Sequence, residues 1–296
     1  MARSDIEAGA ADAPDALPPR RRSRLMATLA QDRKAQVGLA VLGLFVLGMI
    51  MAPWITPQDP NAMSLDMMAA PSPAHPLGTD DLGRDLFSRI LYGTRISLLV
   101  GVSTVAIALA IGVTLGLVAG YFGGWIDLVI MRYIDLQWAF PNFIVAVYLV
   151  AVFGTGLINV IVAIALAFID DFARVARSMT LSLRQEQFVD AARTMGFSHA
   201  RILLRHIQPN ALAPIIVQAT VSVSYAILGE ATLSFLGLGV EATTPTWGLI
   251  LAEGRGFISQ AWWLGVFPGL AIMLVVLSIN FIGDWLRDAL DVRQGV

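Results

Sequence analysis

Cysteine is absent from the 296-residue sequence, which excludes disulfide bonds, thiol catalysis and cysteine-ligated metal sites. Histidine occurs only at His75, His199 and His206, and none of the three belongs to an H-E-x-x-H arrangement. The only lysine, Lys34, has no glycine-rich phosphate-binding loop near it. The formal net charge of −2 does not indicate nucleic-acid binding. The chain is therefore not expected to hold a metal or cofactor, or to be an ATPase by itself.

Charged residues are also scarce. They make up 14% of the chain, against about 25% in a typical soluble protein. Hydrophobic residues make up 56%, and the mean hydropathy is +0.70. This composition predicts a membrane protein.

Long runs without charge indicate the number of membrane crossings. A span needs roughly 20 helical residues to cross a hydrocarbon core about 30 Å thick. The sequence predicts an all-α polytopic protein with six spans, at residues 35–54, 95–121, 127–153, 157–183, 211–235 and 262–286. The first is expected to be a span and not a signal peptide, because the run is long and lacks a small-x-small cleavage site. Pro141 is expected to kink the third span.

The positive charges indicate the orientation, because Lys and Arg gather on the cytoplasmic side of short loops. With the N-terminus inside, 16 of the 20 Lys and Arg residues lie on the cytoplasmic side. The four on the other side are Arg84, Arg89, Arg95 and Arg255. Both termini are therefore expected in the cytoplasm.

This orientation divides the chain into four parts. Residues 1–34 form a cytoplasmic tail that is partly disordered, and residues 35–54 form the first span. Residues 55–94 form an external loop and an elbow helix, capped by Thr79 or Asp80, with Arg84 and Arg89 pointing away from its apolar face. Residues 95–290 form the core, with a cytoplasmic loop at 184–210.

The cytoplasmic loop contains an amphipathic helix. Four apolar residues fall at helical spacing on one face, namely Phe188, Ala191, Ala192 and Met195. Gly196 follows where a helix cap with positive φ is needed, and a second short helix, capped by Ser198, is expected to end before Pro209. An apolar stripe in an aqueous loop needs either a groove in a partner protein or the lipid interface, and its spacing fits both.

The order of residues in this loop carries a resemblance. Asp190-Ala191-Ala192, three residues, Gly196, and then Pro209 thirteen positions later resemble the E-A-A-x3-G-x9-I-x-L-P loop of ABC importer permeases. The sequence departs from that pattern at three positions, which are Asp190 for Glu, His206 for Ile and Gln208 for Leu.

Four further stretches are similar to the second membrane subunit of dipeptide, oligopeptide and nickel ABC importers, over nearly the whole chain after the tail. They are residues 77–95 (Leu-Gly-Thr-Asp-Asp-Leu-Gly-Arg-Asp onward), 120–125 (Gly-Tyr-Phe-Gly-Gly-Trp), 229–239 (Gly-Glu-Ala-Thr-Leu-Ser-Phe-Leu-Gly-Leu-Gly) and 286–291 (Leu-Arg-Asp-Ala-Leu-Asp). The pair Asp170-Asp171 departs from what relatives tend to show.

The resemblance implies a type I importer permease in the bacterial inner membrane, carrying di- or oligopeptides, nickel or glutathione. It also implies a homologous second permease, two ATP-binding subunits that hold ATP and Mg, and an external solute-binding protein. The coupling residues would be Phe188, Asp190, Ala191, Ala192, Met195, Gly196 and Pro209.

Three charged residues fall within or near the predicted spans. Arg132 and Asp135 lie three apart on one helical face, so they can neutralise each other or act in gating. Glu230, near the external end of the fifth span, either pairs with a neighbour such as Arg95 or belongs to an outer gate.

Two other function classes are open from residues alone. A secondary transporter or channel driven by an ion gradient would need a connected set of membrane carboxylates, which is not evident. A membrane enzyme would need a cluster of nucleophile, base or metal ligands, which three dispersed histidines do not supply.

Overall fold

A computed structural model describes residues 27–290, so most of the predicted tail, residues 1–26, lies outside the described residues. The described part is helical, and its one β pairing is an isolated bridge between Thr79 and Asp85. The elements are α2 (Arg33–Ile55), α3 (Leu86–Phe122), α4 (Gly124–Trp138), α5 (Asn142–Phe153), α6 (Leu157–Ala167), α7 (Ile169–Leu183), α8 (Gln187–Thr194), α9 (His199–Ile202), a π-helical turn (Leu203–Ile207), α10 (Gln208–Phe235), α11 (Trp247–Gly254), a 3₁₀ turn (Arg255–Phe257) and α12 (Trp263–Leu290).

Four helices in the described part are long and apolar enough to cross a membrane, namely α2, α3, the continuous stretch His199–Phe235, and α12. The pair α4 and α5 qualifies as a fifth span, bent by 87°. Pro141 precedes α5 and cannot continue α4, as the sequence predicts. The fourth predicted span is also broken, at Phe168, between α6 and α7. The kink expected at Pro141 in the third span is therefore confirmed, whereas the expectation of a continuous helix at 157–183 is wrong.

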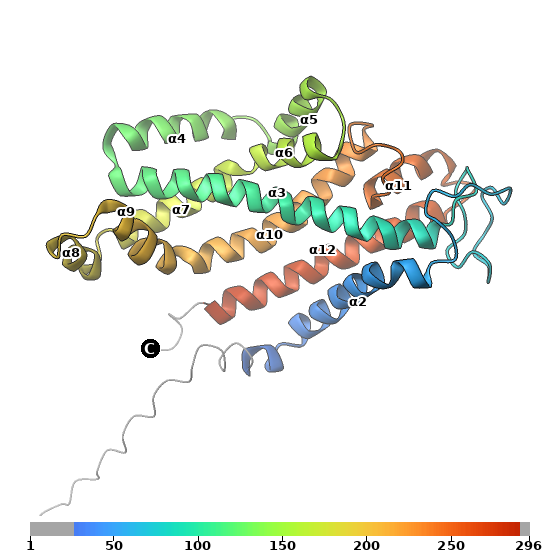
Figure 1. Ribbon diagram of the computed structural model, residues 1–296, viewed down its shortest axis with the longest axis horizontal. Helices are drawn as coiled ribbons and strands as arrows, with labels where there is room; N and C mark the ends of the chain where they lie inside the picture. The colour runs from blue at the N-terminus through green and yellow to red at the C-terminus, as the bar shows by residue number, and fades with distance from the viewer. Residues whose placement is uncertain (1–26, 291–296) are drawn as a thin grey trace, which may run out of the picture.

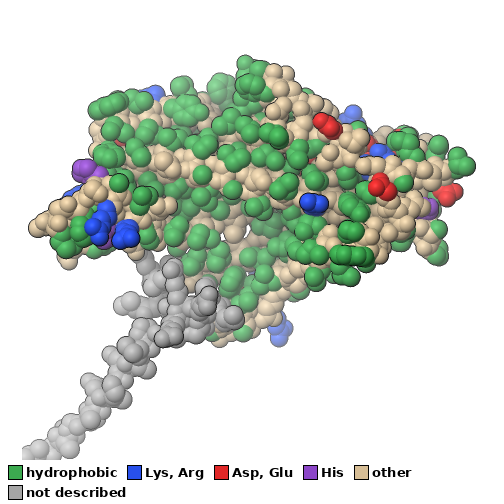
Figure 2. All heavy atoms as spheres, in the orientation of Figure 1, with side chains coloured by type: hydrophobic (Ala, Val, Ile, Leu, Met, Phe, Trp, Pro, Cys, Tyr) green, Lys and Arg blue, Asp and Glu red, His purple; other side chains and the backbone are tan. Residues whose placement is uncertain are grey.

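The long helices α2, α3, α10 and α12 run lengthwise (Figure 1). One end holds α8 and α9 together with the start of α2 and the end of α12 (Figure 1). The opposite end holds the loop of residues 56–85 and α11. Apolar side chains cover most of the flank between them, as Figure 2 shows.

No separate elbow helix precedes the second span. Asp85, and neither Thr79 nor Asp80, caps α3, by accepting a hydrogen bond from the backbone N–H of Ser88 at 2.8 Å. From there α3 continues without a break to Phe122. The prediction of a separate elbow helix is wrong because α3 runs without interruption through Gly93 and Arg95.

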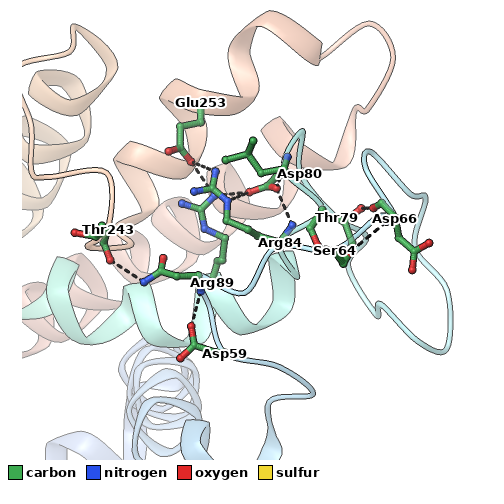
Figure 3. Close-up of polar contacts among 12 residues, drawn as sticks. Asp59, Ser64, Asp66, Thr79, Asp80, Arg84, Arg89, Thr243 and Glu253 are labelled. Carbon is green, nitrogen blue, oxygen red and sulfur yellow. Dashed lines mark hydrogen bonds and ion pairs between the residues drawn. The ribbon is translucent and has the colours of Figure 1, made fainter.

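The two arginines before this helix do not point away from the protein. Arg84 and Arg89 are 5% and 0% exposed, and both contact Asp80 at 2.6 Å. They also contact Glu253 of α11, at 2.9 and 2.7 Å (Figure 3). Buried guanidinium groups need such partners, because an unpaired buried charge costs several kcal/mol, about 3–5 when one partner of a pair is removed. This cluster joins α11 to the start of α3.

Three glycines of α3 allow α7 to approach it closely. Gly112, Gly116 and Gly120 recur every four residues, so they lie along one face of the helix. A Cβ atom on Gly116 would lie 2.3 Å from the backbone oxygen of Ala173, and one on Gly112 would lie 2.6 Å from that of Ile169. This small-residue face is the means by which membrane helices bring their backbones together. We call it the glycine seam.

The glycine seam yields the first prediction. Gly116→Ala should lower the free energy of unfolding by about 1–3 kcal/mol, because the added methyl group forces α3 away from α7. Gly43→Ala is the matched control, since nothing lies within 4 Å of a Cβ atom there. Thermal melting of the purified chain in detergent measures both variants. Equal melting temperatures for the two variants would show that the seam does not determine the packing.

Candidate docking surface and buried charges

The predicted cytoplasmic helix is α8, held at one end of the helix bundle. Val189 and Ala192 are both fully buried and join the main hydrophobic core. Phe188 and Met195 are 39% and 63% exposed, and Ala191 is exposed. The expectation that Ala192 shares the exposed face is wrong, because the bundle covers the side of α8 on which it lies.

The exposed stripe therefore has three apolar residues, Phe188, Ala191 and Met195. At about 100° per residue, these three positions lie within roughly 60° of one another around the helix. We call them the α8 stripe. Asp190 lies outside the stripe, is exposed and pairs with Arg193 at 3.1 Å.

The turn after α8 follows the prediction. Gly196 has φ +75°, a conformation that favours glycine, and Ser198 caps α9 by accepting from the N–H of Arg201 at 3.4 Å. Pro209 does not end the second helix, however. It lies in the first turn of α10, where a missing N–H is tolerated, and the π-helical turn before it keeps the helix continuous from His199 to Phe235.

Contacts that the sequence analysis missed fasten this loop to α3. The hydroxyl of Tyr121 lies 2.9 Å from Nδ1 of His199, and the rings of Tyr121 and Phe122 both pack edge-on against that imidazole. Arg184 donates a hydrogen bond to the backbone oxygen of Gly120 at 2.9 Å. The aromatic pair in Gly-Tyr-Phe-Gly-Gly, at the end of a long helix, was the available signal.

The surroundings of the α8 stripe are polar. Arg193, Arg201 and Arg205 are exposed in the same loop, and Figure 2 shows basic side chains near α8 and α9. Arg201 lies over the ring of Phe197 at 4.2 Å, and that ring stacks on His206. A rim of charge around a small apolar centre is the usual composition of a protein interface.

Within the described residues, Glu230 has no cationic partner. It is 1% exposed, and its Oε1 accepts hydrogen bonds from the hydroxyls of Ser234 and Thr246, both at 2.7 Å. Thr246 also caps α11, accepting from the N–H of Leu249 at 3.1 Å. The expected pair with Arg95 is therefore wrong. The carboxyl group instead joins α10 to the start of α11.

The spacing of Arg132 and Asp135 predicts that they pair with each other, but in the structure they do not. Asp135 instead accepts from Arg174 of α7 at 2.8 Å, whereas Arg132 is exposed and makes no ion pair within residues 27–290. A second such bridge joins Asp127 to Arg177 through two hydrogen bonds of 2.6 and 2.7 Å. These two bridges fasten α4 onto α7, so the charges between these helices are neutralised across the pair.

Two protein families match the sequence. Residues 112–296 match the binding-protein-dependent transport system inner membrane component, and residues 23–73 match the N-terminal TM domain of oligopeptide transport permease C.

Named relatives cover most of the chain. A dipeptide transport system permease protein of Alkalihalophilus pseudofirmus is 48% identical, covering 90% of this chain and 88% of its own length. A di/tripeptide transport system permease protein of Pseudomonas aeruginosa is 42% identical, covering 89% of each. A glutathione transport system permease protein of Pectobacterium atrosepticum is 48% identical over 75% of this chain and 73% of its own length.

Solved structures with a similar fold include the following transporter. It is an inward-facing MetNI methionine ABC transporter, with a TM-score of 0.55 and 19% sequence identity. The match covers 67% of this chain and 94% of that one.

The environment of Glu230 yields the second prediction. Glu230→Gln should melt within a few degrees of the wild type, because its amide oxygen can accept from the same two hydroxyls. Glu230→Ala should lose about 1–3 kcal/mol of stability, because Ser234 and Thr246 lose their buried acceptor. Thermal melting in detergent compares the two. If Glu230→Gln lowered the melting temperature as much as Glu230→Ala, the negative charge of the carboxylate would be needed for stability, contrary to this geometry.

Proposed function

The chain belongs to the family of binding-protein-dependent transport system inner membrane components, and from this premise we propose that it forms half of the pathway of an ATP-driven importer of di- or oligopeptides. A homologous second permease would complete the pathway. Two ATP-binding subunits would dock on the cytoplasmic side, and an external binding protein would deliver the solute. The relatives named for dipeptides and di/tripeptides support the substrate class.

The observation that carries this proposal is the α8 stripe. Its three apolar residues stand on a helix that the bundle holds through Val189 and Ala192, so they are free to enter a groove of a partner. The lipid interface fits the stripe less well. The helix has only eight residues, and its three exposed apolar side chains offer little apolar area to insert between lipids.

Movement of a docked partner would reach the membrane through rigid contacts. The loop that carries the α8 stripe is tied to α3 by the contact of Tyr121 with His199 of α9, and α3 is packed against α7 along the glycine seam. A partner that closes on ATP would therefore move α8, α3 and α7 together. Such a rigid-body switch between two packings can open the pathway to one side and then the other.

The energy must come from other subunits. The sequence offers no glycine-rich phosphate loop, and its single lysine, Lys34, lies in the first turn of α2 beside the N-cap residue Asp32. ATP and Mg would bind in the ATP-binding subunits. The positive charge of the loops supports a bacterial inner-membrane location with both termini in the cytoplasm.

An ion-gradient-driven carrier, the other transport class, has less support. Such carriers need linked carboxylates in the membrane. Asp135 pairs with Arg174, whereas Glu230 is bound by hydroxyls between α10 and α11, so the two carboxylates belong to separate clusters.

Reconstituted uptake tests the proposed function. Vesicles that hold both permeases and the ATP-binding subunits, with ATP inside and the binding protein outside, should accumulate a labelled dipeptide. Omission of ATP or of any one partner should stop uptake, and the purified chain alone should not bind ATP. Uptake driven by a proton or sodium gradient in the absence of ATP would instead support the carrier class.

Two adjacent alanines test the docking surface. Ala191→Arg puts a long charged side chain into the α8 stripe, so the permease should fold and melt normally but retain less than about a tenth of the ATP-binding subunits on co-purification, as expected when a charge is buried unpaired at an interface. Ala192→Arg puts the same side chain into the core, and the permease should lose stability. Normal co-purification of Ala191→Arg would exclude the α8 stripe as the docking element.

A further inference from the structure

A cavity of about 460 Å³ opens between α5, α6, α10 and the start of α7. This volume falls within the range of about 300–1,000 Å³ that is typical of small-molecule sites. Its walls include aromatic and polar side chains, among them Asn142, Phe143, Phe168, Asp171, Tyr225 and Thr232. We call it the α5–α10 cavity. None of the residues of the α8 stripe or of the arginine cluster contributes to it.

One carboxylate in this cavity makes no hydrogen bond or salt bridge within the described residues. Asp171 is half-buried, and within residues 27–290 no hydrogen bond or ion pair engages its side chain. The nearest cation along its helix, Arg174, attracts Asp171 electrostatically, but it forms its ion pair with Asp135 at 2.8 Å and lies over the ring of Trp138 at 4.5 Å. Asp170, the preceding residue, does not line the cavity and has Gln137 within 3.4 Å. Asp171 is therefore the one acidic side chain that this cavity presents to a ligand.

Neutral hydrogen-bonding groups accompany this carboxylate. The amide of Asn142, at the start of α5, and the hydroxyl of Tyr225, on α10, make no hydrogen bond within the described residues. Tyr225 is 61% exposed, which leaves its hydroxyl accessible. The apolar side chains of Ile164, Phe143 and Phe168 complete the wall. The cavity thus combines one negative charge, two uncharged polar groups and an apolar surface.

The cavity lies on the side of the molecule away from α2. In Figure 1, α5 and α6 lie on one flank of α3, and α2 lies on the opposite flank. An unpaired carboxylate within a membrane bundle faces a water-filled cavity or a partner and avoids lipid, because a charge in hydrocarbon is costly. The flank that carries α5 and α6 is therefore the one that faces the solute pathway or the second permease.

We infer that Asp171 binds the protonated amino group of the transported peptide during its passage, while Asn142 and Tyr225 contact the adjacent peptide group and the aromatic wall contacts the first side chain. This assignment rests on the proposed function. It makes Asp171 a residue that selects for a primary ammonium group. A cation of the second permease could also pair with Asp171, and the experiment must separate these two sources of positive charge.

The experiment uses the assembled complex with the wild-type chain, Asp171→Asn, Asp171→Glu and the control Glu241→Gln, which removes an exposed acid outside the cavity. In vesicles with the binding protein, Asp171→Asn should import leucyl-leucine about tenfold more slowly, as loss of a charged hydrogen bond would produce. Asp171→Glu should recover part of the rate, and Glu241→Gln should match the wild type.

A binding measurement without the binding protein identifies the ammonium group. Complexes in nanodiscs should bind leucyl-leucine about tenfold more tightly than N-acetyl-leucyl-leucine, and Asp171→Asn should abolish that preference. An unchanged preference in Asp171→Asn would overturn the inference and leave the proposed function intact. Lower melting of the assembled complex with the preference unchanged would also overturn it, and would assign Asp171 to a cation of the second permease. Failure of ATP-driven uptake by the wild type would overturn the proposed function, and this inference with it.

A labelling measurement serves if Asp171→Asn fails to assemble. The chain has no natural cysteine, so Thr232→Cys places a single thiol at the wall of the cavity while Asp171 remains. Leucyl-leucine should slow the reaction of this thiol with a maleimide severalfold, and N-acetyl-leucyl-leucine should not. Glu241→Cys, outside the cavity, should react at the same rate with either peptide. Equal rates for Thr232→Cys with and without leucyl-leucine would overturn the inference.

Discussion

The close approach of α3 and α7 is the contact on which the other features depend. Gly112, Gly116 and Gly120 remove the side chains that would separate the two helices, so the backbone of α7 lies almost against that of α3. Lipid tails are as apolar as the side chains, so the hydrophobic effect does not drive helices together within the membrane. Membrane helices gain van der Waals contacts when their backbones pack closely. Because α7 leads directly into α8 and begins beside the α5–α10 cavity, this one contact determines where both candidate sites lie.

The docking loop and the cavity therefore share a single support. At the end that carries α8, Tyr121 and Arg184 fasten the loop to the last turns of α3. At its other end α7 carries Asp171, and along its length Arg174 and Arg177 bind α4. A displacement of α8 is thus applied to a helix that carries both a wall of the cavity and the ion pairs to its neighbour. Only residues 184–186 lie between the end of α7 and the start of α8.

The sequence could predict features that depend on local patterning. Long apolar runs located α2 and α12 to within a few residues. Gly196 was predicted to end the amphipathic helix with a positive φ, because glycine adopts that conformation easily, and its φ is positive in the structure. Features that depend on tertiary neighbours escaped prediction. Helical spacing placed Ala191 and Ala192 on one face, but the bundle covers only Ala192. Spacing likewise paired Arg132 with Asp135, whereas Arg174, 39 residues away, forms the bond. The glycine seam was not predicted either, although the sequence contains its signal, a glycine at every fourth position of α3.

The buried arginine cluster also constrains the order in which the protein can mature. Arg89 and Glu253 are separated by 164 residues, so a ribosome must synthesise most of the remaining chain before the second acid becomes available. Until then Asp80 alone faces two guanidinium groups. Until residue 253 is available, burial of residues 80–89 is unfavourable, because two arginines paired with one acid would leave a buried charge with a large desolvation cost. Closure of this end therefore cannot precede the synthesis of residue 253, which makes it one of the later steps in the assembly of the bundle.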